Sequence, residues 1–191
     1  MARPSNRFER RAELVRALEQ VLAEHGLGGA TVARVADVMG CAPGLVHHHF
    51  SGREELMREL ARSLVERFRH QLPNEKDPAA FLEAYVDAAV ALRPSRGRTA
   101  ARAWVGLFAE AVCTASVRRV VQRALQTEVQ RLESRFAALG DDPQRAKENA
   151  AGLVSGVVGC LVFGAIVPNT AVGFAAPYLR RVIARRSSPS S

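Results

Sequence analysis

The chain has 191 residues and a formal net charge of +8, with 27 Lys and Arg residues against 19 Asp and Glu residues. A chain of this length can bury a hydrophobic core without disulfides or metal, and its positive charge favours a polyanionic partner, of which nucleic acid is the commonest. The three cysteines, Cys41, Cys113 and Cys160, are widely spaced and form no CxxC pair, which argues against a disulfide framework or structural zinc and indicates a reducing cytoplasm.

Three amphipathic segments open the chain. Apolar residues at three- and four-residue spacing predict a first helix over residues 6–25, and Gly26 is expected to end it. A short second helix is expected to begin after Thr31, a good N-cap, and to end at Gly40. A third begins at Pro43, a residue tolerated at the first helical position, and the Ser-Gly pair at residues 51–52 ends it. Two helices joined by a glycine-containing turn are typical of a helix-turn-helix, whose second helix enters the major groove of DNA.

The rest of the chain also has helical periodicity. A leucine or phenylalanine at every fourth position predicts a long connecting helix over residues 53–72. Apolar periodicity then resumes in five segments whose breaks contain proline or glycine. No segment shows the alternation of a half-buried strand, so the sequence predicts an all-α protein of about nine helices. The five segments lie near residues 79–92, 99–113, 116–139, 143–167 and 170–186.

The segment TVARVADVMGCAPGLVHHHFSGREELM, residues 31–57, resembles the DNA-binding signature of the TetR-like family of transcriptional repressors. In this resemblance Gly40 falls at the turn, Gly44 lies early in the recognition helix and Phe50 ends that helix. The likeness extends over residues 8–70, and the remainder of the chain agrees with the family in helix number and length.

The resemblance implies an N-terminal three-helix DNA-binding domain, joined by a long helix to a helical domain that binds a ligand and dimerises. The stretch LVSGVVGCLVFGAI is also faintly similar to the choline-responsive BetI-like branch of the family. The expected boundaries place the helix-turn-helix domain at residues 1–52, the connecting helix at 53–72, the ligand-binding and dimerisation domain at 73–186 and a disordered tail at 187–191.

Side chains of the third helix that the core does not require are expected to contact DNA. Leu45 offers a methyl contact to thymine, whereas Thr31 and two arginines can hold phosphates. In the family, tyrosines commonly stand where this chain has His47 and His48, and a lysine stands where it has Arg53. The candidate DNA-binding residues are Thr31, Arg34, Pro43, Gly44, Leu45, His47, His48, His49 and Arg53.

The three consecutive histidines, His47 to His49, also invite a metal-binding interpretation. Successive residues of a helix diverge by about 100° and cannot converge on one ion as residues four apart can. The sequence therefore predicts neither a metal site nor a cofactor.

Aromatic residues with mostly small or aliphatic neighbours could line an effector pocket in the C-terminal helices. A single carboxylate among them would suit an effector that is small and mostly apolar or cationic. Ordinary core packing explains each aromatic residue equally well. The candidate pocket residues are Tyr85, Trp104, Phe108, Glu110 and Phe163.

Residues 150–167 form a stretch of 18 positions without a charged residue, and its GxxxG spacing is found in membrane helices. Half of the stretch consists of small residues, however, and an apolar helix can also be buried in a core and a subunit interface. We expect an isologous homodimer. The candidate interface residues are Gly152, Gly156, Cys160, Phe174 and Tyr178.

Taken together, the sequence predicts a cytoplasmic, homodimeric repressor that binds a pseudopalindromic operator in double-stranded DNA, has no membrane association and is released by its effector. A membrane-associated or adaptor protein that uses the apolar C-terminal helices is the alternative. The chain contains no GxSxG, HExxH, P-loop or GxGxxG motif, so no enzymatic activity is expected.

Overall fold

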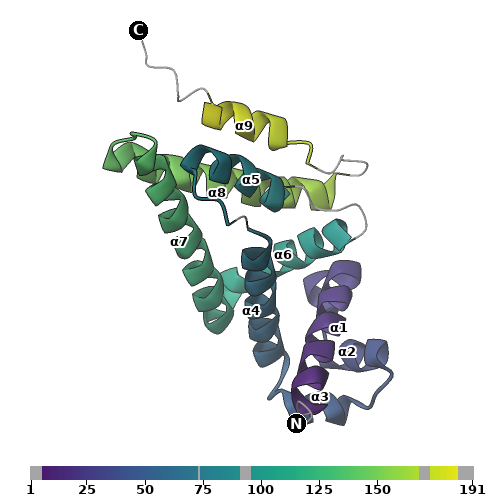
Figure 1. Cartoon of the computed structure of the whole chain (residues 1–191). Helices are drawn as coiled ribbons and strands as arrows, with labels where there is room; N and C mark the ends of the chain where they lie inside the picture. The colour runs from purple at the N-terminus through teal and green to yellow at the C-terminus, as the bar shows by residue number, and fades with distance from the viewer. Residues whose placement is uncertain (1–5, 73, 91–95, 168–172, 185–191) are drawn as a thin grey trace. The chain divides into compact units, whose positions relative to one another are not determined.

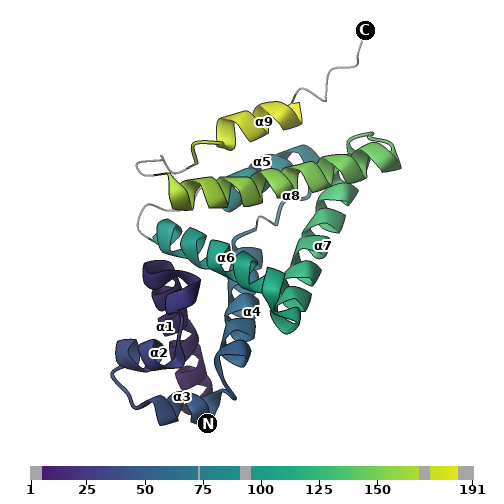
Figure 2. The same cartoon turned by 180° about the vertical axis from the view of Figure 1, so that it is seen from behind.

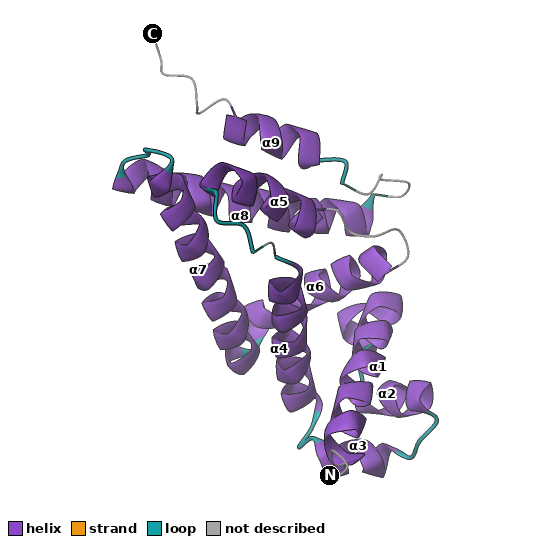
Figure 3. Ribbon diagram, in the orientation of Figure 1, coloured by secondary structure: helices purple, strands orange, loops and turns teal. Residues whose placement is uncertain are grey.

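The computed structural model describes residues 6–72, 74–90, 96–167 and 173–184, and helices are the only regular structure in these ranges (Figures 1 and 3). The predicted all-α fold is therefore confirmed. The helices are α1 (Asn6–Gly29), α2 (Val32–Met39), α3 (Pro43–His49), α4 (Arg53–Gln71), α5 (Pro78–Val90), α6 (Arg96–Cys113), α7 (Ala115–Ala138), α8 (Pro143–Ile166) and α9 (Ala176–Ala184).

Local signals in the sequence set most helix ends. The predicted stop at Gly26 is a break inside α1, because this residue has φ +67° and ψ −173° and a last helical turn follows it. Asp142 caps α8 by accepting a hydrogen bond from the backbone N–H of Arg145 at 3.0 Å, with Pro143 at the first helical position. The last helix begins at Ala176, later than the 170 expected, and the predicted tail lies outside the described residues.

The chain divides into two compact units. The first comprises the residues up to Glu66 together with Thr99–Val121, and the second comprises Arg67–Arg98 and the residues from Gln122 onward. The first unit thus contains all three helices of the predicted DNA-binding domain and most of α6. The functional boundaries expected after residues 52 and 72 stay a prediction.

In the first unit, α6 lies close against the C-terminal half of α1 (Figure 2). A Cβ atom at Gly106 would lie 2.7 Å from Cδ1 of Leu22, which is closer than two such carbons pack. A larger residue at this position would require the Leu22 side chain to shift. The contact attaches α6 firmly to the bundle that carries α2 and α3.

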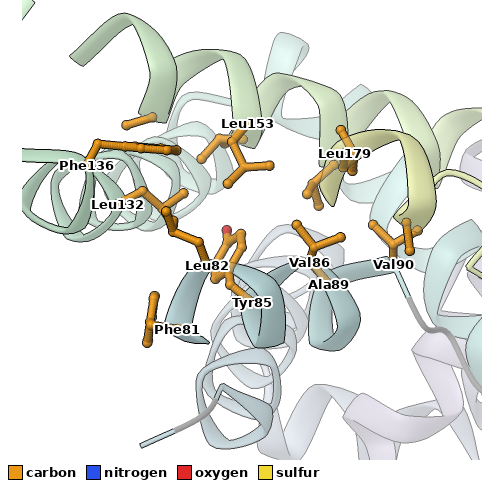
Figure 4. Close-up of a cluster of buried hydrophobic side chains, with 14 of the residues drawn as sticks. Phe81, Leu82, Tyr85, Val86, Ala89, Val90, Leu132, Phe136, Leu153 and Leu179 are labelled. Carbon is orange, nitrogen blue, oxygen red and sulfur yellow. The ribbon is translucent and has the colours of Figure 1, made fainter. Parts of the chain in front are cut away.

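The core of the second unit is a cluster of buried apolar side chains from α5, α7, α8 and α9 (Figure 4). Phe81, Leu82 and Tyr85 supply its α5 side, and Arg135 covers the Phe81 ring with its guanidinium carbon 4.4 Å from the ring centroid. α5 packs against both α8 and α9. This unit therefore has a core of its own.

Candidate nucleic-acid interface

Helix α2 is capped at both of its ends. Thr31 caps α2, since its Oγ1 accepts the backbone N–H of Arg34 at 3.3 Å. Gly40 ends α2 in the left-handed conformation, with φ 60° and ψ 37°. The N–H groups of Gly40 and Cys41 donate to the last carbonyls of α2 at 3.0 Å each. These bonds satisfy both helix ends and fix the direction in which α3 leaves.

Helix α3 has a buried face and an exposed face. Val46 and Phe50 are each 1% exposed and point into the first unit. On the opposite side Pro43, Gly44, His47 and His48 are exposed, and Leu45 is half-buried between the two faces. Thr31 and Arg34, at the start of α2, are exposed as well. The structure therefore leaves most of the predicted DNA-binding side chains free to meet a ligand.

His49 was predicted to lie on the DNA-binding surface, but its side chain is buried. It is only 8% exposed, because it lies three residues after Val46 and shares the buried face. Its Nδ1 is buried without a hydrogen-bond partner. Burial, followed by the charges of His48 and of arginines on α1, lowers the pKa of His49 and favours the neutral ring. A direct contact between this side chain and DNA is not compatible with its position.

Arg11 on α1 supports the recognition helix, and sequence reasoning missed it. Its Nη1 donates to the carbonyl oxygen of His49, and its Nη2 donates to Oε1 of Glu55 at 3.2 Å. The guanidinium carbon also lies 4.0 Å from the ring centroid of Phe50. One side chain thus holds the end of α3, the following phenylalanine and the start of α4 together. No local pattern could have indicated this, since the partners are 38 and 44 residues away.

Glu55 also fixes the start of α4. Its Oε2 accepts the backbone N–H of Ser51 at 2.8 Å and the Ser51 hydroxyl at 2.9 Å. The backbone hydrogen bond from Ser51 is the main reason that the pKa of Glu55 lies below 4.5. Glu55 therefore fixes the short connection between α3 and α4 to the first turn of α4.

Arg53, a predicted phosphate contact, is bound within the protein. It donates from Nη1 and Nη2 to the two oxygens of Glu110 at 3.0 and 2.8 Å, and from Nε to the carbonyl of Ala30 at 2.8 Å. Glu110 also accepts the hydroxyl of Thr114 at 2.6 Å. The hydrogen bonds from Arg53 lower the pKa of Glu110 against the opposing effect of burial. A phosphate would have to compete with this arrangement.

The predicted effector-pocket residues fall in both units. Trp104 and Phe108 stack on α6 with ring centroids 5.5 Å apart, and Glu110 lies on the same helix. Tyr85 is buried in the second unit, where Phe163 is exposed and meets the Phe174 ring at 5.2 Å. The assembly of these residues into one pocket stays a prediction.

The predicted interface residues also divide into two groups. Gly156 packs within the chain, since a Cβ atom there would lie 3.2 Å from Cδ2 of Leu179, and Cys160 packs against the core cluster. Gly152, Phe174 and Tyr178 are exposed, with Tyr178 at 62%. The exposed group is available to a second copy of the chain.

Helix α8 is long and apolar enough, by length and composition, to cross a membrane. The pair α6 and α7 passes the same test together, with a 120° bend between them. Only 28% of the most apolar window of α8 is buried by the chain itself. Much of this apolar helix is therefore left for another partner to cover.

Comparisons with known proteins agree with the geometry of α2 and α3. A family described as "Bacterial regulatory proteins, tetR family" matches residues 14–60. The HTH-type transcriptional regulator BetI of Stenotrophomonas maltophilia is 31% identical over 163 residues, which cover 83% of this chain and 82% of that protein. The chain belongs to the tetR family of transcriptional regulators. Another BetI, from Rhizobium meliloti, is 29% identical over 157 residues, 78% of this chain and 75% of the relative.

Solved structures extend the likeness of this tetR-family regulator over nearly its whole length. A transcriptional regulator from Rhodococcus sp. Rha1 has a TM-score of 0.83 and 26% identity, covering 92% of this chain and 94% of its own. A regulator from Saccharomonospora viridis in complex with choline has a TM-score of 0.75 and 16% identity, covering 93% and 95%. The second likeness concerns the fold alone. The family and its BetI-like relatives are DNA-binding transcriptional regulators rather than enzymes.

Proposed function

We propose that this tetR-family protein is a repressor that binds a pseudopalindromic operator as a homodimer and leaves it when a small effector binds. The exposed face of α3 is the observation that carries the proposal. Arg11 and Phe50 hold this helix from behind, so it can be presented to a DNA groove without losing order. Its exposed side chains would read base edges, and Thr31 and Arg34 would contact phosphates.

A homodimer is supported by large apolar side chains that a single chain leaves exposed. Phe163 and Ile166 lie three residues apart on α8, and Tyr178 and Val182 lie four residues apart on α9, so each pair shares one helix face. A second copy related by a twofold axis would cover these faces. The two recognition helices would then lie about 34 to 36 Å apart, one turn of DNA.

The effector would be a small molecule that is mostly apolar or cationic. Choline, a cation, is bound in the Saccharomonospora viridis structure, which has the same fold. The effector would favour a conformer whose two DNA-binding units no longer match successive grooves, and it must bind this conformer more tightly than the other. The protein would act on DNA in the cytoplasm.

The test is selection of bound duplexes from a random DNA pool by the purified protein. We expect a pseudopalindromic consensus whose half-sites lie about ten base pairs apart. A variant with both His47→Ala and His48→Ala should lose or change the consensus, because these exposed side chains would face the groove. Recovery of no common sequence would contradict the proposal, as would a protein that remains monomeric on its selected DNA.

A further inference from the structure

Glu128 is a carboxylate at a core-facing position of the second unit. It lies on α7 between Leu125 and Leu132, at the three- and four-residue spacings that share a helix face. Leu132 is fully buried, and Glu128 itself is only 6% exposed. An ionisable residue in such a place requires partners for its oxygens.

Among the described residues, only one of the two Glu128 oxygens takes part in an ion pair. Oε1 lies 3.7 Å from Nε of Arg69, which is beyond hydrogen-bond length, and the Arg69 side chain is itself exposed. Oε2 is buried without a hydrogen-bond partner. Burial raises the pKa of Glu128, and Arg131 and Arg69 only partly oppose this. The carboxylate is therefore held in the interior at a cost in free energy.

The surroundings of Glu128 are aromatic and not fully closed. Burial and the charge of Glu128 raise the pKa of Tyr85, whose hydroxyl points away from α5 into the cluster (Figure 4). Phe68 packs edge-on against the Tyr85 ring at 6.0 Å. Phe68, Leu125 and Val129 are only partly buried against the core. The part of the core that contains Glu128 thus has apolar side chains that the chain leaves incompletely covered.

We propose that Glu128, with Tyr85 and Phe68, is the polar anchor of the effector site, and that Oε2 accepts a hydrogen bond from a hydroxyl or ammonium group on a small apolar molecule. This inference rests on the proposed function, because it names the chemistry that the effector must carry. It assigns the recognition role to Glu128 and not to Glu110, whose two oxygens are already bound by Arg53. A buried acceptor left unpaired without its ligand discriminates strongly for molecules that supply the missing donor.

The first test compares three probes of similar shape by calorimetry and by thermal shift. Choline carries a charge and a hydroxyl, 3,3-dimethyl-1-butanol carries the hydroxyl without the charge, and tetramethylammonium carries the charge without a donor. We expect the two hydroxyl compounds to bind, and tetramethylammonium to bind at least about tenfold more weakly, the loss of one hydrogen bond to a charged group. Equal binding of all three, or binding of none at millimolar concentration, would overturn the proposal.

The second test uses Glu128→Leu, which removes the acceptor and keeps the site apolar. The variant should unfold about 2–4 °C higher than the wild type without ligand, because an unpaired buried group is gone. Binding of the hydroxyl probes should fall at least about tenfold while affinity for operator DNA stays unchanged. The matched control is Glu133→Leu on the same helix, which should keep probe binding.

Retained probe binding in Glu128→Leu would overturn the assignment of Glu128. Lower stability of that variant without ligand would also overturn it, since it would mean that the carboxylate is structural. Failure of the proposed function is a separate result. A wild type that selects no DNA consensus contradicts the repressor, whereas one that selects a consensus but ignores the probes contradicts the anchor alone.

Discussion

Arg53, the first residue of α4, donates two hydrogen bonds of 3.0 and 2.8 Å to the two carboxylate oxygens of Glu110 on α6. The same guanidinium donates to the carbonyl of Ala30, which lies between α1 and α2, and to that of Leu27 in the last turn of α1. Bidentate arginine–carboxylate pairs combine strength with a fixed geometry. A displacement of α6 would therefore also tend to move the start of α4 and the residue that precedes the N-cap of α2.

Replacing Glu110 with Gln should lower the free energy of unfolding by about 1–2 kcal/mol, a value reduced because Arg53 is about one-third exposed. Urea denaturation measures this. Glu59→Gln, which breaks only the exposed pair between Glu59 and Arg62, should change stability by less than about 0.5 kcal/mol.

The stabilisation by Glu110 also has a pH dependence. The pKa of Glu110 lies below the ordinary 4.5 in the folded chain, so its contribution is complete above about pH 4.5 and is lost as the pH falls through the folded value. The difference in stability between wild type and Glu110→Gln should therefore shrink in acid. A difference that grows below pH 4.5 would show that Arg53 does not hold this carboxylate.

Arg11 should be required for an ordered recognition helix. Arg11→Ala removes the bond to the carbonyl of His49, the pair with Glu55 and the contact with the Phe50 ring, and should cost about 2–3 kcal/mol in unfolding free energy. Operator affinity should fall as well. Arg11→Lys should recover little, because an ammonium group cannot reproduce the planar fork.

Arg10→Ala is the matched control for Arg11→Ala, since Arg10 pairs only with exposed Glu13 three residues away. It should leave stability almost unchanged. Denaturation of the three variants, together with fluorescence anisotropy on labelled operator, separates these outcomes. Equal stability of Arg11→Ala and Arg10→Ala would contradict the supporting role of Arg11.

Gly44→Ala should separate folding from DNA binding. A Cβ atom at Gly44 meets nothing within 4 Å, and alanine is the better helix former, so stability should rise by up to about 1 kcal/mol. The added methyl group would stand on the exposed face of α3, where a groove must approach closely. Operator affinity should fall, and unchanged affinity would show that this face does not meet DNA.

Tyr178→Glu should convert the dimer into monomers without unfolding the chain. Tyr178 is 62% exposed on α9, so a charge there is harmless in one subunit and unfavourable in an apolar interface. Sedimentation velocity measures the change. Val112→Glu is the control, because Val112 is also apolar and is 74% exposed but lies on α6. Dissociation by both variants would point to a different interface.

His49 should make the folded protein less stable in mild acid. Its pKa is lowered by burial, so the unfolded chain binds more protons than the folded chain below about pH 6.5, and stability falls as the pH drops from about 7.5 to 5.5. His49→Leu should flatten this part of the stability curve. His70→Gln, at an exposed position, should leave it unchanged. Thermal unfolding at several pH values gives the comparison.

The sequence predicted those features that depend on neighbouring residues. Thr31 and Gly40 cap the two ends of α2, and Pro43 is the first residue of α3, so the structure has these helix ends where the sequence indicated. Gly26 was also correctly identified as a helix breaker, although one more turn follows it. Local chemistry decides such features, so one sequence suffices for them.

Features that depend on distant residues could not be predicted. Arg53 has the position of an exposed helix start, and only folding brings Glu110, 57 residues later, against it. His49 looked like the third member of an exposed run, but helical geometry places it with Val46 on the buried face. The unpaired oxygen of Glu128 has no sequence signal, because a glutamate on an amphipathic helix is usually solvated.

The unit that contains the recognition helix is not one continuous length of polypeptide, since it takes in residues 99–121 after the chain has passed through part of the other unit. Grafting the N-terminal residues alone onto a foreign sensor would leave behind α6, with Gly106 against Leu22 and Glu110 against Arg53. A DNA-binding unit moved to another protein must therefore include α6, or the foreign sensor must supply a helix that makes the same two contacts.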